Sequence, residues 1–142
     1  VTAAGWSSTG GGTPLGATGV PAGKLPVAKR INQVEKYSFI RVDGEEKVLT
    51  LRASTEGSRT TTGVVGVSVC QITDAGWAEG ENVPSDRAPK YDAQVCVAGD
   101  PAADGSTWSF NLLTFTSPTD ARGLALVPTG ASIDYQVVFE RT

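Results

Sequence analysis

The stretch VVGVSVCQIT, residues 64–73, is dense in valine and isoleucine. β-Branched residues at consecutive positions favour a strand whose two faces are both buried. The strand pattern ends at Asp74-Ala75-Gly76, directly before Trp77. We therefore expect residues 64–73 to form a central strand of a β-sheet.

Short strand patterns separated by turn residues occupy the chain on both sides of this stretch. They predict strands at residues 25–29, 34–43, 46–54, 93–99, 107–115, 123–128 and 132–140. Pro26 places the first of these at a sheet edge, because proline cannot donate to a central ladder. No stretch longer than about one turn has a helical pattern.

Two turn signals predict hairpins. Asp43-Gly44 predicts that residues 34–43 pair with residues 46–54, and Thr129-Gly130 predicts a terminal hairpin. The last strand alternates with period two, so its two sets of side chains should face opposite sides. The inward set is Ile133, Tyr135, Val137 and Phe139, and the outward set is Asp134, Gln136, Val138 and Glu140.

These patterns together predict an all-β fold, an antiparallel β-sandwich of jelly-roll or Ig-like topology. A sandwich is favoured over a barrel because the inward Val, Leu and aromatic side chains can interdigitate between two layers about 10 Å apart. A chain of 142 residues has room for one core. We expect the sandwich domain at residues 25–142, preceded by an extended Gly-rich N-terminal arm at residues 1–24.

The expected arm has neither a strand nor a helix period. Ordering a Gly-rich segment costs conformational entropy, which contact with its own sandwich or with a neighbouring subunit would offset. The candidate docking residues of the arm are Trp6, Leu15 and Val20. Trp6 is the main candidate anchor, because an aromatic side chain can bury about 150–250 Å².

Composition disfavours several classes of function. The net charge of −3 and the pI near 4.9 argue against a nucleic-acid partner, which requires clustered Lys and Arg. No apolar run is long enough for a membrane span. The absence of histidine removes Ser-His and Cys-His nucleophile pairs and imidazole metal ligands. Because the sequence contains no methionine, we expect Val1 to mark either an end left by a signal peptidase or an artificial boundary, and we favour export.

Cys70 and Cys96 lie in two apolar strand patterns, GVSVCQI and DAQVCVA. This setting favours a disulfide between strands over a solvent-exposed thiolate, and two buried thiols are the alternative. Closing this loop would stabilise the fold by roughly 3.5 kcal/mol on the chain-entropy model. Two cysteines without histidine supply half of the ligands of a structural zinc site, so we expect no metal there.

The order of six segments resembles the DNRLRE-type modules of bacterial secreted and cell-surface proteins, particularly actinobacterial versions with a cysteine pair. The segments, spanning residues 34–139, are YSFIRV, LTLRAS, VVGVSVCQITDAGWAEG, RAPKYDAQVCVAG, DGSTWSFNLLTF and RGLALVP. The resemblance implies a β-sandwich without a catalytic centre, of a kind thought to bind polysaccharide or to serve as a spacer or adhesive part. By this resemblance Trp77 matches the loop tryptophan, Cys70 and Cys96 the cysteine pair, and Trp108 with Phe110 the core strand.

The long irregular segment at residues 74–92 contains the candidate ligand or cap residues, which are Trp77, Glu79, Asp86 and Tyr91. Aromatic faces beside carboxylates are typical of a sugar-binding cleft. The alternative, which we favour, is a cap in which Trp77 covers the open end of the sandwich. Turn and surface roles account for the carboxylates, so we expect neither a catalytic residue nor a cofactor.

Two functions fit these expectations. The first is a non-catalytic, exported structural or interaction protein of a cell-surface or extracellular assembly, which docks through its N-terminal arm onto copies of itself or other surface proteins. The second is a carbohydrate-binding module that uses the 74–92 loop to bind polysaccharide. An enzyme is disfavoured, because without histidine it would depend on surface carboxylates alone.

Overall fold

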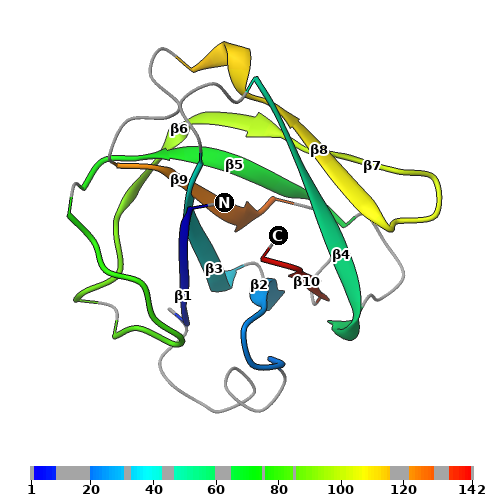
Figure 1. Cartoon of the computed structure of the whole chain (residues 1–142), viewed down its shortest axis with the longest axis horizontal. Helices are drawn as coiled ribbons and strands as arrows, with labels where there is room; N and C mark the ends of the chain where they lie inside the picture. Colours follow the sequence, from blue (N-terminus) through cyan, green and yellow to red (C-terminus); the bar gives the residue numbers. More distant parts are fainter. Residues whose placement is uncertain are drawn as a thin grey trace.

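The computed structural model of the chain is built almost entirely from β-strands (Figure 1). It describes residues 2–8, 20–30, 33–42, 47–59, 65–74, 76–84, 86–115, 122–129 and 135–141. The elements in this part of the chain are β1 (Ala3–Ser8), β2 (Leu25–Arg30), β3 (Gln33–Arg41), β4 (Val48–Arg59), β5 (Val67–Ile72), β6 (Tyr91–Ala98), β7 (Asp100–Pro101), β8 (Thr107–Asn111), the 3-10 helix η1 (Leu112–Thr114), β9 (Leu124–Pro128) and β10 (Tyr135–Phe139).

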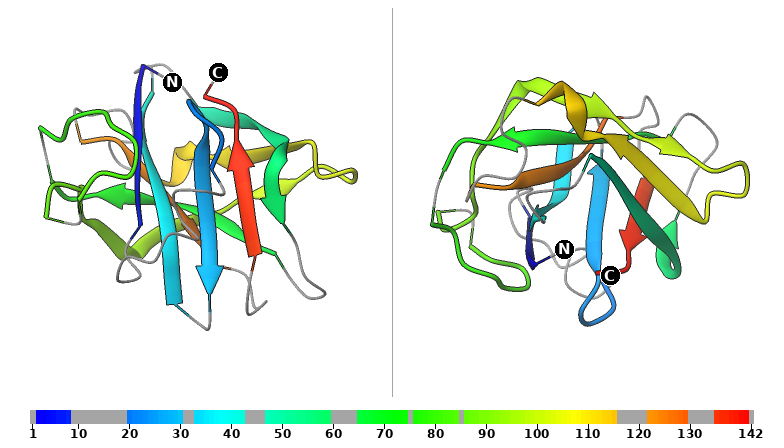
Figure 2. Two further views of the ribbon diagram at one scale, coloured as in Figure 1. Left: turned by 90° about the horizontal axis from the view of Figure 1, so that it is seen from below. Right: turned by 45° about the horizontal axis from the view of Figure 1, so that its top comes forward.

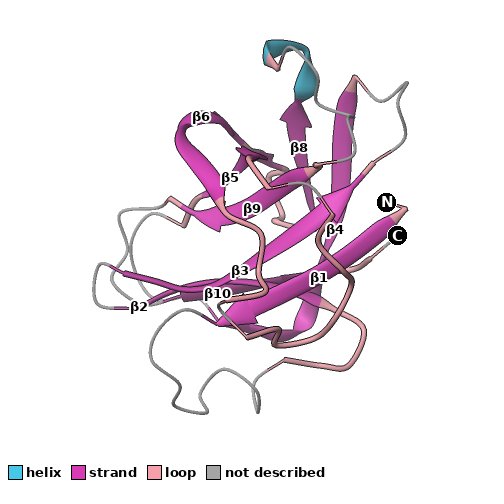
Figure 3. Ribbon diagram, turned by 90° about the vertical axis from the view of Figure 1, so that its left-hand side faces the viewer, coloured by secondary structure: helices cyan, strands magenta, loops and turns pink. Residues whose placement is uncertain are grey.

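The strands form one antiparallel sheet that curls into a half-barrel. Their order is β6-β5-β9-β3-β2-β10-β4-β8-β7, and β1 pairs with the remaining edge of β3. Because the sheet curls, the layer containing β1, β2, β3 and β10 faces the layer containing β5, β6 and β9 (Figure 3). The expected all-β, antiparallel sandwich class is confirmed.

Strand β3 joins the two layers because it pairs with three other strands. β1 lies along one of its edges, from Lys36 to Arg41. The opposite edge is shared: β2 pairs with β3 as far as Lys36, and β9 pairs with the stretch from Ser38 to Ile40. Every side chain from Lys36 to Ile40 is buried. From Lys36 to Ile40, β3 is therefore covered on both faces as well as both edges.

Strand β5 lies between β6 and β9, which confirms the central strand predicted for residues 64–73. Its register sets Cys70 directly opposite Cys96, and the two form a disulfide with Cα atoms 4.0 Å apart. Cys70 is fully buried, whereas Cys96 is half-buried. The disulfide therefore fastens edge strand β6 to the interior of the sheet.

Both hairpin predictions are wrong for the described strands. β4 pairs with β8 and β10 rather than with β3. β9 lies between β3 and β5, while β10 lies between β2 and β4. The turns at residues 43–46 and 130–134 lie outside the described residues. A turn sequence predicts only that the chain reverses direction, because long-range packing of the layers selects each strand's partner.

The prediction that Pro26 marks a sheet edge is also wrong, because β2 lies between β3 and β10. The ladder between β2 and β3 covers Ala28–Arg30, and Pro26 lies beyond its end. There the Ser38 hydroxyl donates to the Pro26 carbonyl at 2.7 Å. The N–H and C=O positions of one strand residue point to the same edge. The missing N–H of Pro26 therefore faces β3 where that ladder has stopped, so no ladder hydrogen bond is lost.

On β10 the inward set is confirmed for the described residues, since Tyr135, Val137 and Phe139 belong to the main core. The outward prediction is wrong for two residues, because Gln136 is 1% and Val138 is 0% exposed. Period-two alternation shows which side chains share a face, but it does not show whether the second face is covered. Of the remaining positions, Glu140 pairs with Lys24, while Ile133 and Asp134 lie outside the described residues.

The N-terminal residues 3–8 belong to the sheet, so the predicted domain boundary after residue 24 is wrong for them. Trp6 is 3% exposed within its own chain. The sequence AAGWSS lacks β-branched residues, which is why it gave no strand signal. Val20 is half-buried in the bend before β2, and Leu15 lies outside the described residues.

We expect Gly123→Ala to destabilise the fold more than Gly105→Ala. Both glycines have positive φ, 84° and 75°, so either alanine should cost about 1 kcal/mol in backbone strain. A Cβ at Gly123 would also lie 2.3 Å from the Ile40 carbonyl oxygen, whereas one at Gly105 meets nothing within 4 Å. Urea unfolding should give a loss of roughly 3 kcal/mol for the first variant and about 1 kcal/mol for the second. Equal losses would contradict the close approach of β9 to β3.

Candidate interaction site

The segment that joins β5 to β6, residues 73–90, forms a loop that is closed at its base. The Thr73 N–H donates to the Lys90 carbonyl at 2.9 Å, and the Lys90 N–H donates to Asp74 Oδ2 at 2.8 Å. Further along, the Ala88 N–H donates to the Pro84 carbonyl at 3.0 Å. Loops whose ends are tied and whose interior is packed hold their residues in fixed positions. The described residues of the 73–90 segment are therefore held by hydrogen bonds at the base of the loop and within it.

Trp77 is a buried residue of this segment, 6% exposed. Its indole N–H donates to the Arg122 carbonyl at 2.6 Å, and its ring packs edge-on against Phe39 with centroids 4.9 Å apart. The Arg41 guanidinium lies over the ring, 3.9 Å from the centroid, and donates to the Trp77 carbonyl. In this position Trp77 caps the smaller hydrophobic cluster. It offers no open ring face on which a sugar could stack.

Tyr91, at the start of β6, packs edge-on against Tyr37 with centroids 5.2 Å apart. The Tyr37 hydroxyl donates to the Pro89 carbonyl at 2.8 Å. Burial, together with the nearby Tyr91 and Asp74, raises the pKa of Tyr37 to about 12. Burial also raises the pKa of Tyr91. Both phenols stay protonated at neutral pH and hold the base of the 73–90 segment against β3.

Residues 79–83 of the same segment run along the outer edge of β1 (Figure 2). β1 pairs with β3 along its whole inner edge. On the outer edge, the Trp6 N–H donates to the Gly80 carbonyl at 3.1 Å, and the Val83 N–H donates to the Trp6 carbonyl at 2.9 Å. β1 is thus hydrogen-bonded on both sides. We call the position between β3 and residues 79–83, which β1 occupies, the β1 slot.

Two serine side chains of β1 add hydrogen bonds to the slot. The Ser7 hydroxyl donates to the Val83 carbonyl at 2.6 Å, and the Ser8 hydroxyl donates to Asn82 Oδ1 at 2.7 Å. Trp6 is buried beside them. These contacts give the slot side-chain selectivity in addition to its main-chain hydrogen bonds.

Gly5 restricts which strand can fill the slot. A Cβ at this position would lie 2.4 Å from Phe39 Cε2 and 2.9 Å from the Gly80 carbonyl oxygen. The Phe39 ring is fully buried and is held in place by Trp77. A strand with any side chain here would have to displace the ring or the 79–83 backbone. The slot therefore accepts a strand with glycine at this position.

Glu79 fastens β1 at its beginning. Its Oε1 atom accepts the Ala4 N–H at 3.0 Å and a hydrogen bond from Arg141. The pKa of Glu79 is lowered, mainly by the Ala4 N–H, with Arg141 and Arg41 contributing, while partial desolvation acts in the opposite direction. An exposed ion pair of this kind adds little stability by itself. The role of Glu79 is to connect β1 and the C-terminal residues to the 73–90 segment.

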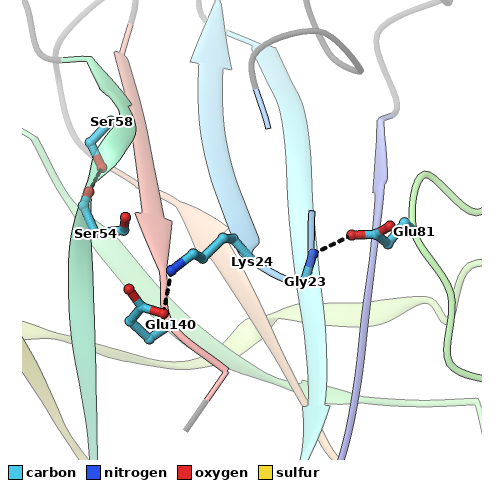
Figure 4. Close-up of polar contacts among 6 residues, drawn as sticks. All are labelled: Gly23, Lys24, Ser54, Ser58, Glu81 and Glu140. Carbon is cyan, nitrogen blue, oxygen red and sulfur yellow. Dashed lines mark hydrogen bonds and ion pairs between the residues drawn. The ribbon is translucent and has the colours of Figure 1, made fainter. Parts of the chain in front are cut away.

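A hollow of about 290 Å³ lies beside the slot and is lined by charged side chains, Lys24, Glu79, Glu81 and Arg141 among them. In Figure 4, Lys24 is paired with Glu140, and Glu81 accepts the Gly23 N–H at 2.7 Å. Lys24 and Glu81 therefore make contacts within the chain, and these contacts hold the residues before β2 in place.

A larger hollow of about 740 Å³ lies between β4, β10 and the turn that joins β7 to β8, with Trp108 and Val137 among its lining residues. Beside it β4 bulges away from β10. Ser58 closes the bulge, because its hydroxyl accepts the Val138 N–H at 3.0 Å. The same hydroxyl donates to the Ser54 carbonyl (Figure 4). The Ser58 hydroxyl thus replaces a missing backbone partner in the ladder.

The predicted site residues do not form one cluster. Trp77 and Tyr91 belong to the same hydrophobic cluster, Glu79 faces β1, and Asp86 lies exposed in a turn. Among the described residues, no group of three or more His, Cys, Asp or Glu side chains is arranged to hold a metal ion. The slot itself was not predicted from the sequence. Its only local signal was Trp6, which is an unusually large side chain in a Gly-rich segment.

No protein-family model, curated protein or solved structure matches the chain. The resemblance to DNRLRE-type modules therefore stays a prediction. Within the part of the chain that the structure describes, no helix has the length and hydropathy needed to cross a membrane.

The hydrogen bond from the Ala4 N–H to Glu79 should weaken in acid. The contacts of Glu79 lower its pKa in the folded state below the ordinary value of 4.5. The stabilisation that they provide is complete above that ordinary value and is lost as the pH falls through the lowered folded-state pKa. The exchange protection of the Ala4 amide, measured by NMR between about pH 6 and about pH 3, should fall accordingly.

Glu79→Gln should give an Ala4 protection that does not change over this range, because its amide does not titrate. Glu81→Gln is the matched control, since Glu81 accepts a different N–H and should leave the Ala4 response as in the wild type. A wild-type Ala4 protection that is independent of pH would contradict the role of the Glu79 carboxylate.

Proposed function

We propose that this protein is a non-catalytic, exported interaction protein that assembles with copies of itself by exchanging strand β1. In the assembly, β1 of one copy occupies the β1 slot of the next. The observation that carries the proposal is that the fold contains a receptor for one extended segment, which pairs with β3 along one edge and is hydrogen-bonded through Trp6 to Gly80 and Val83 on the other.

Strand addition is an established way to join chains, because main-chain hydrogen bonds supply affinity and side-chain pockets supply selectivity. The slot has both features: the ladder with β3, and the close fit of Gly5 against Phe39. When an identical element is exchanged between copies, the contacts are those of the single chain, so exchange introduces no new interface chemistry. A slot that fits its own β1 fits the β1 of a neighbour equally well.

The connection between Ser8 and Leu25 is long enough for exchange. At about 3.3–3.6 Å per residue, its extended length is on the order of 55 Å. A domain of 142 residues has a diameter on the order of 40 Å. The connection can therefore reach either the slot of its own domain or that of an adjacent copy.

The chemistry of the titratable groups supports a role in contact. Tyr37, Glu79, Tyr91 and Asp104 are described groups whose pKa values are shifted. Each shift has a structural cause, namely burial of a phenol or a hydrogen bond that fastens β1 or a turn. Export is supported by the Cys70–Cys96 disulfide, because disulfides persist in oxidising compartments.

The alternative of carbohydrate binding through the 74–92 loop has less support. Trp77 is enclosed, Asp86 is exposed in a turn, and Tyr91 belongs to strand β6. A cleft for a sugar needs an aromatic face and polar groups directed at one point. The side chains of this loop instead hold the slot in place.

Two single variants, Ser8→Cys and Asn82→Cys, test the exchange when they are refolded together. The Ser8 hydroxyl and Asn82 Oδ1 are 2.7 Å apart, so cysteines at these positions lie within disulfide range. Because the two cysteines are on different chains, they meet only if β1 enters the slot of another copy. After mild oxidation we expect disulfide-linked heterodimers, with peptide mapping showing the bond between positions 8 and 82.

The matched control mixes Ser8→Cys with Asp104→Cys, because Asp104 is exposed in the turn between β7 and β8, and that turn lies on the opposite side of the molecule from β1 (Figure 1). This mixture should give few dimers. The double variant Ser8→Cys/Asn82→Cys tests whether the geometry supports the bond, since it can close the disulfide within one chain. If the double variant closes its disulfide and the slot mixture gives no more dimers than the control, exchange of β1 is ruled out.

A further inference from the structure

A buried lysine and a buried glutamine meet on one face of the sheet. Lys36 on β3 is 0% exposed and Gln136 on β10 is 1% exposed. Lys36 Nζ donates a hydrogen bond to the side-chain carbonyl oxygen of Gln136. An amine and a carboxamide held in contact away from water are the two reactants of an amide exchange.

The strand register brings these two side chains together. Lys36 lies opposite Ala28 on β2, and Ala28 lies opposite Gln136 on β10. Residues directly opposed in antiparallel strands point to the same face, so the three side chains form one row. Two strand spacings, about 9.6 Å, separate the outer members of the row. The small side chain of Ala28 leaves the space across which the two long side chains reach each other.

Burial of the charged lysine favours a reaction between these two side chains. An ammonium group taken out of water is costly, and the cost remains to some degree even where it is paired. Lys36 and Gln136 each have further contacts in the fold. Converting the ammonium to a neutral amide and releasing its charge to the solvent removes the desolvation cost of that charge. Two reactants that are held in a geometry suited to attack can also react as if one were present at an effective concentration of roughly 10⁵–10⁸ M.

We propose that Lys36 and Gln136 become joined by an intramolecular isopeptide bond. Lys36 first loses one proton, and Nζ of the resulting amine attacks Gln136 Cδ, so that the Nζ–Cδ bond forms and the Cδ–Nε2 bond breaks. The departing nitrogen takes up the protons that Nζ loses. From one lysine ammonium and one carboxamide the products are one secondary amide and one ammonium ion, so atoms and charge balance. The step needs no oxidant, reductant or other co-reactant.

The bond would tie β3 to β10 across β2. The two residues are 100 positions apart in the sequence, and covalent closure of a long loop restricts the unfolded chain. It would lock the layer against which β1 pairs. The isopeptide bond does not depend on the exchange of β1, and either proposal can fail without the other.

A second lysine contact in the chain gives an internal control. Lys24 contacts Glu140 in a partly exposed ion pair. A carboxylate carries negative charge and lacks the neutral leaving group of a carboxamide, and here water reaches both partners. We expect no bond between these two residues.

The intact mass of the full-length protein, denatured and reduced, tests the proposal. The expected mass is one ammonia molecule below that of the sequence. Trypsin does not cleave after an acylated lysine, so residues 31–41 should remain one peptide, linked to residues 123–141. An intact mass equal to that of the sequence, with residues 31–36 and 123–141 recovered as separate peptides, would overturn the proposal.

Two variants locate the mass loss. Lys36→Arg keeps the positive charge but removes the nucleophile, and Gln136→Met removes the carboxamide. Each should have the full mass of its own sequence. Loss of ammonia that persists in both variants would assign the reaction to other residues and overturn the proposal. The decisive measurement is made on the wild-type protein, so it stands even if a variant fails to fold.

Discussion

The packing of Phe39 against both Gly5 and Trp77 is the contact on which the rest of this structure depends. Phe39 is fully buried, and its ring leaves no room for a side chain at position 5. The same ring supports Trp77, which is also held by the Arg41 guanidinium and the Arg122 carbonyl. Because Trp77 is fixed, residues 79–83 lie where they can bind the outer edge of β1. One aromatic side chain thus positions both walls of the β1 slot.

Strand β3 connects the Phe39 contact to the other strands of the sheet. It carries Phe39 on one face and Lys36 on the other, and it pairs with β1, β2 and β9. A strand covered on both edges and both faces cannot move without disturbing each layer. The disulfide plays a parallel role at the far edge, where it fastens β6 to β5. The described strands therefore hold one another in place, and β3 together with residues 79–83 forms the position that β1 occupies.

Local composition was enough to predict the features that depend on near neighbours in the sequence. Residues 64–73 are dense in β-branched side chains, and β5 is central; the apolar surroundings of Cys70 and Cys96 predicted their disulfide. Features that depend on distant residues could not be predicted in this way. Glu79 accepts a hydrogen bond from Ala4, which is 75 positions away in the sequence. Strand β1 could be identified only from its pairing with β3, because its own residues give no strand pattern. The partners of β4 and β10 were set by how the layers close rather than by the turns beside them.

The central claim is that β1 lies in its slot with Gly5 against the ring of Phe39, whether that β1 belongs to the same chain or to a neighbour. Nuclear Overhauser effects between the Gly5 α-protons and the Phe39 ring protons test this contact most directly. The account predicts strong cross-peaks, together with slow exchange of the Trp6 and Val83 amides, which bind across the outer edge. Random-coil shifts for Gly5, no cross-peak to Phe39 and rapid exchange of both amides would contradict it.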